Sequence, residues 1–278
     1  RLDVMFSGLL SIPQAVLLGI VEGITEFLPV SSTGHLLVVG ELIGFGTGSS
    51  STAADTYSIA IQFGAILAVL LLYRIRVWSA MKGLVGADAD GRAFLIRLIV
   101  AFLPAAFLGV LAGDAMKSAL FGPVPVTIAW VVGGVFLLRW KPTVGSVSLH
   151  EMPIRAALII GCAQSIALWP GVSRSLVTLV AALAVGLSMS SAIEFSFLLG
   201  LITLSSATAL DLTKHGSELV DQFGILAPAI GLVCAFITAV MAVKWMVGYL
   251  ESHSLRVFGW YRLAIGAVSV VLLATNVL

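Results

Sequence analysis

Residues 19 to 35 read Gly-Ile-Val-Glu-Gly-Ile-Thr-Glu-Phe-Leu-Pro-Val-Ser-Ser-Thr-Gly-His. Carboxylates, hydroxyls and a histidine interrupt an otherwise apolar segment here. Glu22 and Glu26 are four residues apart, so on a helix they share one face and repel each other unless a cation or protons are supplied. Pro29 ends the helix, and the polar loop after it is one that a membrane tolerates only against protein or water. This stretch predicts a functional site inside a membrane.

The composition of the 278-residue chain also predicts a membrane protein. The chain is 59% hydrophobic and 10% charged, with a mean hydropathy of +1.11, which is too apolar for a soluble domain of this length. Long apolar stretches without strict alternation favour a helical bundle over a β-barrel. The net charge is +1 and the basic residues are scattered, so membrane lipids are expected as partners and nucleic acid is not.

Apolar stretches of two lengths predict two kinds of element. Six full transmembrane helices are expected, at residues 58–73, 95–112, 124–140, 192–210, 225–248 and 257–276. Residues 12–45 and 155–187 instead predict re-entrant helical hairpins, because the arms of the first do not supply the roughly 20 apolar residues of a span. Ser11 and Pro13 predict the start of the first hairpin, as N-cap and first-turn residues.

Charges between the spans predict their orientation. Basic residues gather in alternate loops, at Arg74, Arg76, Lys82, Arg92, Arg97, Arg139, Lys141, Arg155, Lys244, Arg256 and Arg262. By the positive-inside rule these loops are cytoplasmic. The other loops carry Asp114, Lys117, Asp211, Lys214, Glu218 and Asp221 and are expected outside, with both ends of the chain. No cleavable signal peptide is expected.

The chain also repeats itself. Ala60-Ile-Gln62-Phe matches Ala192-Ile-Glu194-Phe, Pro29-Val-Ser-Ser32 matches Pro170-Gly-Val-Ser173, and Glu22 has an approximate counterpart in Gln164 if a one-residue slip is allowed. These matches predict two related halves, residues 1–140 and 150–278, which form one membrane domain. Because the charge map runs the halves in opposite directions, the fold prediction is an all-α polytopic membrane protein of two inverted-topology repeats, with the hairpin loops meeting near the midplane.

The second hairpin loop carries the strongest candidate for phosphate binding. It reads Trp169-Pro-Gly-Val-Ser-Arg174-Ser175. A guanidinium in apolar surroundings needs an anion, and its donors fit phosphate oxygens. Hydroxyls of Ser173, Ser175 and Thr178 would complete the cradle. The alternative is an internal salt bridge from Arg174 to Glu22, Glu26 or Glu194, while Gln62 and Glu194 fit helix packing as well as a site.

For the first hairpin loop, the alternative is that its serines cap the next helix and His35 makes one hydrogen bond in the bundle. That alternative does not explain two glutamates, a histidine and an arginine at interrupted membrane segments, where a charged side chain costs about 2.5–3.5 kcal/mol. A serine nucleophile, a histidine base, an arginine clamp and carboxylates that could hold a divalent cation together predict hydrolytic phosphoryl transfer.

These motifs resemble those of a known family, the undecaprenyl pyrophosphate phosphatases of bacteria. Residues 22–35 are similar to the family's first signature and Ala-Leu-Trp-Pro-Gly-Val-Ser-Arg-Ser at 167–175 to its second; residues 194–199 and 207–212 extend the similarity. The resemblance implies removal of the terminal phosphate from a polyprenyl diphosphate carrier at the outer side of the bacterial cytoplasmic membrane. This recycles the carrier for cell-wall synthesis and, on overexpression, gives bacitracin resistance.

Carried over residue by residue, the resemblance assigns Glu22 and Glu26 as the acidic pair, Ser32 as nucleophile or phosphate-contacting hydroxyl, His35 as proton-transfer partner and Arg174 as clamp. Further phosphate contacts are expected from Ser31, Thr33, Ser173 and Ser175. Glu22 and Glu26 could hold Mg²⁺ or Ca²⁺, and no organic cofactor is expected. One departure is Leu176-Val177-Thr178, where the family usually has Gly-Ala-Thr.

Two rival functions stay open on the sequence. Inverted repeats with broken helices are also a transporter architecture, so a polyprenyl-phosphate flippase is one rival, and an inactive lipid-binding relative is the other. The pair of Ser32 and His35 distinguishes them, because hydrolysis requires such a pair and transport does not. The sequence leaves a homodimer open. Cys162 and Cys234 lie in apolar runs and predict buried small side chains instead of a disulfide or a metal site.

Overall fold

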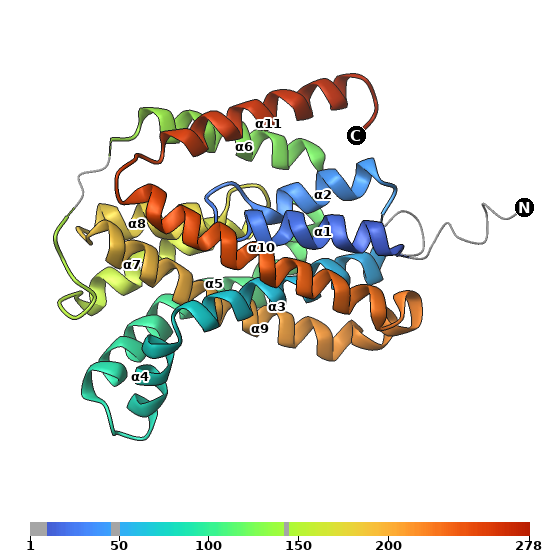
Figure 1. Ribbon diagram of the computed structural model, residues 1–278. Coiled ribbons are helices and arrows are strands. Elements are labelled where there is room, and N and C mark those ends of the chain that lie inside the picture. Colours follow the sequence, from blue (N-terminus) through green and yellow to red (C-terminus); the bar gives the residue numbers. More distant parts are fainter. Residues whose placement is uncertain (1–9, 46–50, 142–144) are drawn as a thin grey trace, which may run out of the picture.

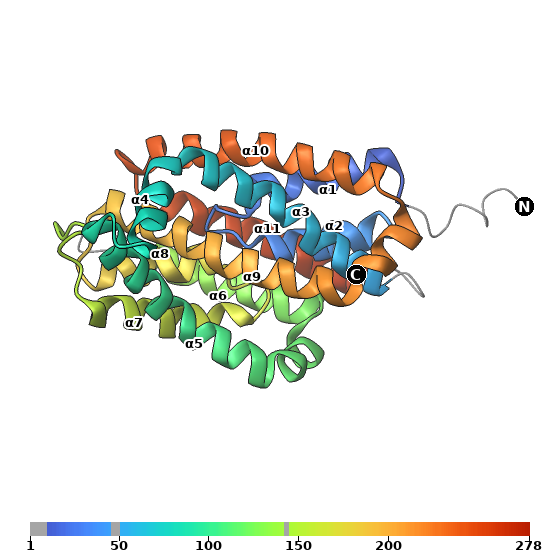
Figure 2. The same ribbon diagram turned by 90° about the horizontal axis from the view of Figure 1, so that it is seen from below.

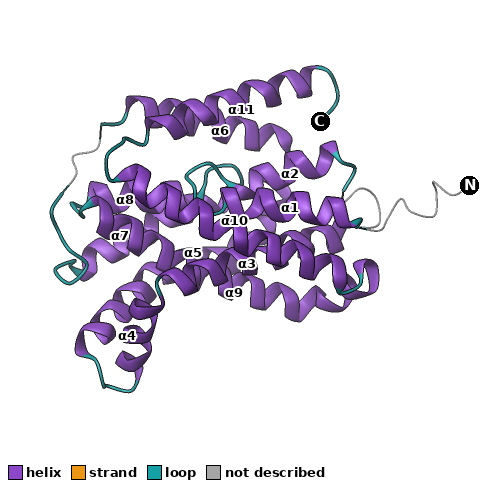
Figure 3. Ribbon diagram, in the orientation of Figure 1, coloured by secondary structure: helices purple, strands orange, loops and turns teal. Residues whose placement is uncertain are grey.

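The computed structural model describes residues 10–45, 51–141 and 145–278. These ranges are helical throughout apart from turns and loops, and they contain no strand beyond one isolated bridge between Val147 and Leu187 (Figure 3). The predicted all-α fold is therefore confirmed.

Both predicted hairpins form helix-loop-helix units. The first consists of α1 (Ile12–Thr25) and α2 (Ser32–Leu42), and the second of α7 (Ile154–Gln164), a 3₁₀ turn η2 (Ser165–Leu168) and α8 (Arg174–Ala184). Ser11 caps α1 as predicted, in a capping box with Gln14. Each connecting loop begins where a helix breaks, so helix ends supply free backbone groups at the polar residues.

The remaining helices are longer than those of the hairpins, except α4, which has 11 residues. They are α3 (Ser51–Leu72), α4 (Arg74–Leu84), α5 (Ala89–Leu120), α6 (Pro123–Arg139), α9 (Met189–Phe223), α10 (Leu226–Leu250) and α11 (Arg256–Ala274). Five helices of the described chain are long and apolar enough to cross a membrane: Ala53–Leu72, Ala89–Gly113, Met189–Phe223, Leu226–Leu250 and Arg256–Ala274. The predicted span at 124–140 corresponds to α6, which has 17 residues.

Two stretches expected as outer loops are helical instead. Asp114 and Lys117 lie within α5, and the acidic stretch from Asp211 to Asp221 lies within α9, which has 35 residues. No proline or glycine pair interrupts α9, and it ends only at Gly224, whose φ of 67° suits a glycine after a helix. Charge alone therefore placed these loop boundaries too early.

The helices pack in crosswise pairs. The first hairpin packs against the second half of the chain through α1 and α10, and the second hairpin packs against the first half through α7 and α5 (Figures 1 and 2). Helix α3 packs on α9, and α6 on α11. Close packing fixes the first pair: a Cβ added to Gly23 would lie 2.2 Å from the carbonyl oxygen of Ala235. The α1 backbone beside Glu22 is thus held directly against α10.

Candidate active site

The two hairpin loops meet in the middle of the bundle. We call residues 26–31 the first tip and residues 169–173 the second tip. The hydroxyl of Ser175 donates to the Leu28 carbonyl oxygen at 2.7 Å, and Nη2 of Arg174 lies 2.8 Å from Oε1 of Glu26. Residues nearly 150 positions apart in the sequence are therefore in direct contact, as expected from the paired hairpins.

Each tip ends in a serine with an unusual backbone. Ser31 has a backbone φ of 73° and Ser173 one of 78°. Residues other than glycine seldom adopt such positive φ values. Each serine side chain accepts a hydrogen bond from the helix it precedes, from Gly34 N and Leu176 N respectively. Such a conformation costs about 1–3 kcal/mol and persists only where the surroundings enforce it. The tips are thus held in place by their neighbours.

Arg262 is one of the groups that hold them. It lies in α11 with its side chain fully buried, and Nη2 donates to the carbonyl oxygens of Ala129 at 2.7 Å and Gly171 at 2.9 Å. Nη1 donates to Val172 O at 3.2 Å and to Pro29 O at 3.4 Å. One guanidinium therefore binds both tips and α6. The sequence analysis counted Arg262 among the cytoplasmic loop charges. That assignment is wrong, because Arg262 is buried inside the bundle and backbone carbonyl oxygens bind both of its terminal nitrogens.

Glu26 links the predicted nucleophile to the predicted clamp. Its Oε2 accepts a short hydrogen bond from the hydroxyl of Ser32, and its Oε1 accepts from Arg174. Glu26 and Ser32 are both buried. A carboxylate that contacts a serine hydroxyl in this way can take its proton. The same carboxylate is held in place by its ion pair with Arg174.

Arg174 is positioned on several sides. Nη1 donates to the carbonyl oxygen of Ser196 at 3.2 Å, and the guanidinium carbon lies 5.4 Å from the centre of the Phe27 ring. Gly200 leaves the space for it, because a Cβ there would lie 1.7 Å from Nη1. Nε of Arg174 is buried without a hydrogen-bond partner. The internal salt bridge considered from the sequence exists, and the arginine still has a free donor.

His35 faces a different group from Ser32. Its Nδ1 donates to the Ser31 carbonyl oxygen at 2.6 Å, so Nε2 of the neutral ring accepts from the Tyr261 hydroxyl at 2.9 Å. The ring stacks on Tyr261, with the ring centres 5.7 Å apart, and meets Trp130 edge to face. In these contacts His35 holds the backbone of the first tip, and its expected role in proton transfer stays a prediction.

Glu22 lies one helical turn before Glu26 and is fully buried. Neither of its carboxylate oxygens has a hydrogen-bond partner within the described chain. Oxygens left in this way suit a proton or a hard cation such as Mg²⁺ or Ca²⁺. Among the residues that the structure describes, no group of three or more His, Cys, Asp or Glu side chains could hold a metal. The pair therefore has the right donor chemistry for a cation and needs further oxygens from a ligand.

A cavity of about 160 Å³ lies between the tips. Six of the predicted site residues line it: Glu26, Ser31, Ser32, Thr33, Ser173 and Arg174. Ser175 is used to tie the tips together, and Glu22 and His35 are not among the lining residues. The cavity is smaller than the roughly 300–1,000 Å³ of pockets for drug-sized ligands, so it suits a small anionic group.

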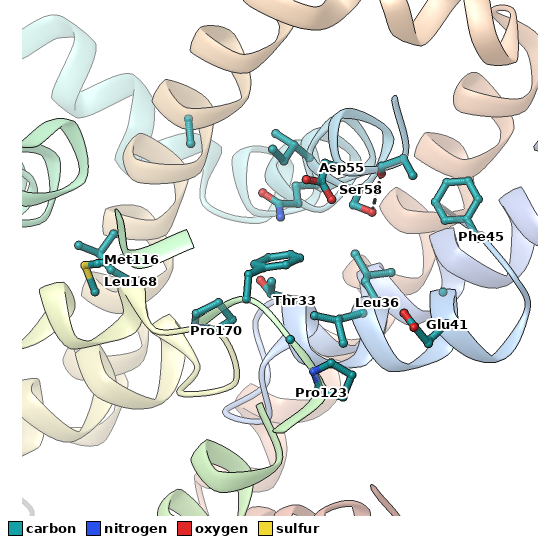
Figure 4. Close-up of a pocket in the computed structure, with 18 of the residues that line it drawn as sticks. Thr33, Leu36, Glu41, Phe45, Asp55, Ser58, Met116, Pro123, Leu168 and Pro170 are labelled. Atoms are coloured by element: carbon teal, nitrogen blue, oxygen red, sulfur yellow. Dashed lines mark hydrogen bonds between the residues drawn. The ribbon is translucent and has the colours of Figure 1, made fainter. Parts of the chain in front are cut away.

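A wider groove of about 540 Å³ continues from this cavity (Figure 4). The residues that line both are Thr33, Gln62, Ala167, Leu168 and Pro170. In Figure 4, Thr33 and Pro170 lie between Leu168 on one side and Glu41 with Phe45 on the other. The walls of the groove are mostly apolar, with polar side chains such as Ser58 among them. A small polar cavity that opens into an apolar groove fits a molecule with an anionic head and a hydrocarbon tail.

Other sequence hypotheses can now be decided. Glu194 lies 2.6 Å from Nε of Arg76 in an ion pair, whereas Gln62 lines both the cavity and the groove. Cys162 and Cys234 are free, as expected. The expectation that both are buried is wrong, because Cys162 is exposed and Cys234 is only half-buried.

Two residues were not predicted as site residues. Arg262 could have been found from its position inside an apolar run, where a charge needs a partner. Gln164 lines the cavity and is 2% exposed; its match to Glu22 was the available signal.

Comparison with known proteins agrees with this geometry. A family profile described as "Bacitracin resistance protein BacA" matches residues 15–268. A protein of Sorangium cellulosum named undecaprenyl-diphosphatase is 44% identical over 262 residues, which cover 92% of this chain and 84% of that protein. Proteins of the same name from Nitrosomonas europaea and Rhodopseudomonas palustris are each 42% identical, covering 92% and 94% of this chain and 92% and 97% of their own lengths. This chain therefore belongs to the bacitracin resistance protein BacA family.

Proposed function

We propose that this protein is an undecaprenyl-diphosphatase, which hydrolyses undecaprenyl diphosphate to the monophosphate and inorganic phosphate. The observation that carries the proposal is the buried chain of Ser32, Glu26 and Arg174 beside a small cavity. The names of the relatives supply the substrate. Release of the carrier for another round of cell-wall synthesis, and resistance to bacitracin, follow from this activity.

In the first half of the reaction Ser32 attacks the terminal phosphorus. The bond from the serine oxygen to phosphorus forms, the bond from phosphorus to the bridging oxygen breaks, and the lipid monophosphate leaves with the electron pair. Glu26 accepts the serine proton through the hydrogen bond that already joins them. Arg174 stabilises the charge on the transferred group.

In the second half water hydrolyses the phosphoserine. The water oxygen bonds to phosphorus while the bond from phosphorus to the Ser32 oxygen breaks. The Ser32 oxygen recovers its proton from Glu26, and both water protons leave with inorganic phosphate as H₂PO₄⁻. The buried position of both residues limits the access of other nucleophiles. His35 supports this step by fixing the Ser31 carbonyl and remains a candidate for proton transfer.

Glu22 and Glu26 would hold a divalent cation, with diphosphate oxygens as its other ligands. The chemistry that a bound Mg²⁺ or Ca²⁺ supplies is neutralisation of charge on the diphosphate. The two unpartnered oxygens of Glu22 support this part of the proposal. Turnover of the purified protein in excess chelator tests it: abolition is expected, and full activity would leave the glutamates as proton-handling groups.

Two inverted repeats form the scaffold in this proposal, with six spans and two re-entrant hairpins. The crosswise packing supports it, since α1 with α10 corresponds to α7 with α5, while α3 with α9 and α6 with α11 pair equivalent helices. In Figure 2 the pairs α1–α10 and α5–α7 lie at opposite edges of the bundle, with α3 and α9 between them. The halves are residues 1–140 and 150–278.

We place the site toward the outer face of the bacterial cytoplasmic membrane. The groove is lined by Glu41, Met116 and Phe121, near the ends of helices predicted to lie outside. A cysteine at Ser217 should react with an impermeant thiol reagent on intact cells, and one at Gly86 should not; the reverse pattern would overturn the orientation. Both tips come from one chain, so a homodimer, which stays a prediction, is not needed to complete the site.

Phosphate release from undecaprenyl diphosphate by purified protein tests the activity. The wild type is expected to release phosphate and a Ser32→Ala variant is not. A flippase is the second candidate, because of the repeat architecture. Transbilayer movement of labelled polyprenyl phosphate in proteoliposomes, without phosphate release by the wild type, would favour that candidate.

A further inference from the structure

Gln164 is the last residue of α7 and lines the small cavity together with Glu26, Ser32 and Arg174. It is 2% exposed. Its Oε1 lies 3.3 Å from the hydroxyl of Thr203, whereas its Nε2 is buried without a hydrogen-bond partner in the described chain. A buried amide nitrogen has two protons to donate, and native structures rarely leave such donors unused.

A second donor in the same cavity wall is also free. Nε of Arg174 has no partner, although its two terminal nitrogens bind Glu26 and Ser196. Two unused N–H groups, one of them on a cation, mark a place for an acceptor with negative charge. Gln164 lies in α7 and Arg174 in α8, so both donors reach the cavity from the second hairpin and not from the first tip.

The Thr203 hydroxyl contributes to the orientation of the Gln164 amide. Its single proton is shared between Oε1 of Gln164 and the carbonyl oxygen of Leu199, which lies 2.9 Å away. When this proton is directed to Oε1, the NH₂ group of the amide faces the cavity. An anion beside Arg174 favours the same orientation, because the alternative would place the amide oxygen against it.

Glu22 and Gln164 occupy matching positions in the two hairpins. Each lies nine residues before the serine that caps the next helix, Ser31 in one case and Ser173 in the other. Both are buried, and both have side-chain atoms without partners. The carboxylate of the first hairpin can only accept or bind a cation, while the amide of the second can donate.

We propose that Gln164 is a substrate ligand, and that its amide N–H₂ donates to a non-bridging oxygen of the diphosphate held by Arg174. This inference rests on the proposed function for the identity of the ligand. Because the amide is neutral, it contributes a donor without a second charge that would compete with Arg174 for Glu26. Thr203 acts as a positioning residue that keeps the donors directed at the anion.

Three variants of the purified full chain test the proposal. Gln164→Met keeps the volume and removes the donors; Gln164→Glu keeps the shape and adds a negative charge; Thr203→Val removes only the orienting hydroxyl. Gln14→Met is the matched control, because Gln14 lies at the start of α1 and binds the Ile43 carbonyl oxygen, away from the cavity. The measurements are kcat and KM with undecaprenyl diphosphate, and the rise in the thermal unfolding midpoint caused by inorganic pyrophosphate.

Gln164→Met should lose about 10- to 100-fold in kcat/KM and most of the pyrophosphate effect, as expected for a hydrogen bond to a charged ligand. Gln164→Glu should lose more, and the ratio of its turnover to that of the wild type should rise as the pH falls, because the protonated acid regains a donor. Thr203→Val should lose a few-fold in kcat/KM. Gln14→Met should match the wild type in kcat/KM and in the pyrophosphate effect, although loss of its capping-box contact with Ser11 lowers its own midpoint.

Values of kcat/KM within about twofold of the wild type for both Gln164 variants would overturn the proposal. So would an unchanged response to pyrophosphate in variants whose midpoints are lowered, since that result means a purely structural role. A wild type that binds pyrophosphate through Gln164 but releases no phosphate from the lipid would instead contradict the proposed function and leave the anion ligand in place.

Discussion

The two tips have the same backbone and different chemistry. Each ends in a serine with positive φ whose side chain caps an 11-residue helix. The next residue is Ser32 in the first hairpin and Arg174 in the second, and both bind the same Glu26 carboxylate. The same positive-φ serine cap therefore occurs in both hairpins. It places the proposed nucleophile Ser32 on one side of Glu26 and the cation of Arg174 on the other. The two hairpins thus share a backbone conformation, and the first residue of the helix after each tip, Ser32 or Arg174, gives that tip its chemical role.

The following positions differ for reasons of space. Gly34 packs against Trp130, where an added Cβ would lie 2.9 Å from the indole ring. Its counterpart Leu176 is buried in the hydrophobic core, and its N–H still caps the helix through Ser173. The second tip therefore tolerates leucine where the family usually has glycine, because the side chain points into the core while the backbone does the capping.

Ser32→Ala should have the largest effect. Removal of the nucleophile is expected to lower kcat by about 10³-fold or more, measured as phosphate release from undecaprenyl diphosphate. Ser206→Ala is the control, because that exposed hydroxyl only contacts the Ile202 carbonyl oxygen of its own helix. Substantial turnover by the Ser32 variant would mean that Glu26 activates water directly, and the two tips would then share no covalent step.

Arg174→Lys should lower kcat by about 100-fold although the charge is kept, because an ammonium cannot bind Glu26 and phosphate with a planar fork. Steady-state kinetics measure the loss. Arg76→Lys provides the comparison: it preserves the ion pair with Glu194 away from the cavity and should remain within about twofold of the wild type. Equal activity in both variants would remove Arg174 from the site.

Arg262→Met should act on both tips together. Loss of the guanidinium removes its hydrogen bonds to the carbonyl oxygens of Ala129 and Gly171, so we expect the free energy of unfolding to fall by about 2–4 kcal/mol and kcat to fall about 10-fold. Thermal unfolding and kinetics check this. Arg256→Met, at the exposed start of the same helix, should change neither. A stable, fully active Arg262 variant would show that the tips hold their own conformation.

The smallest effects should come from the capping serines. Glycine at Ser31 or Ser173 relieves the positive φ and loses only part of the cap, whereas alanine loses the cap and keeps the strain. Each alanine variant should therefore be less stable than its glycine counterpart by about 1 kcal/mol. Thermal midpoints of the four proteins measure this. A difference at one tip alone would mean that the two loops are alike in geometry but not in energetics.

Much of the fold could be predicted from the sequence because hydrophobicity and helix breaks are local properties. The apolar runs gave the long helices, and Ser11 with Pro13 gave the start of α1. Charge patterns were weaker evidence: the acidic residues from Asp211 to Asp221 continue α9, because no proline interrupts that helix, and it ends only at Gly224. Helix ends depend on capping residues more than on charge.

Most residues of the candidate site could be predicted from the sequence, but the contacts between their side chains could not. The spacing of Glu22 and Glu26 placed both on α1, but only the folded chain shows Glu26 between Ser32 and Arg174. His35 lies three residues after Ser32, a separation that suggested a direct pair. The helix instead turns its ring to Tyr261 of α11, a contact 226 residues away in the sequence. Such long-range contacts have no signature in local spacing.

Arg262 also has a consequence for how the protein is made. Arg262, which binds both tips, lies in α11, and α11 follows every element that lines the cavity in chain order. While the chain is being synthesised, those elements are therefore made before α11 is available. The tips gain the contacts of Arg262 only after α11 has packed against α6, so a chain cut before α11 would contain Glu26, Ser32 and Arg174 and still have reduced turnover. Packing of α11 thus controls when the site reaches full activity.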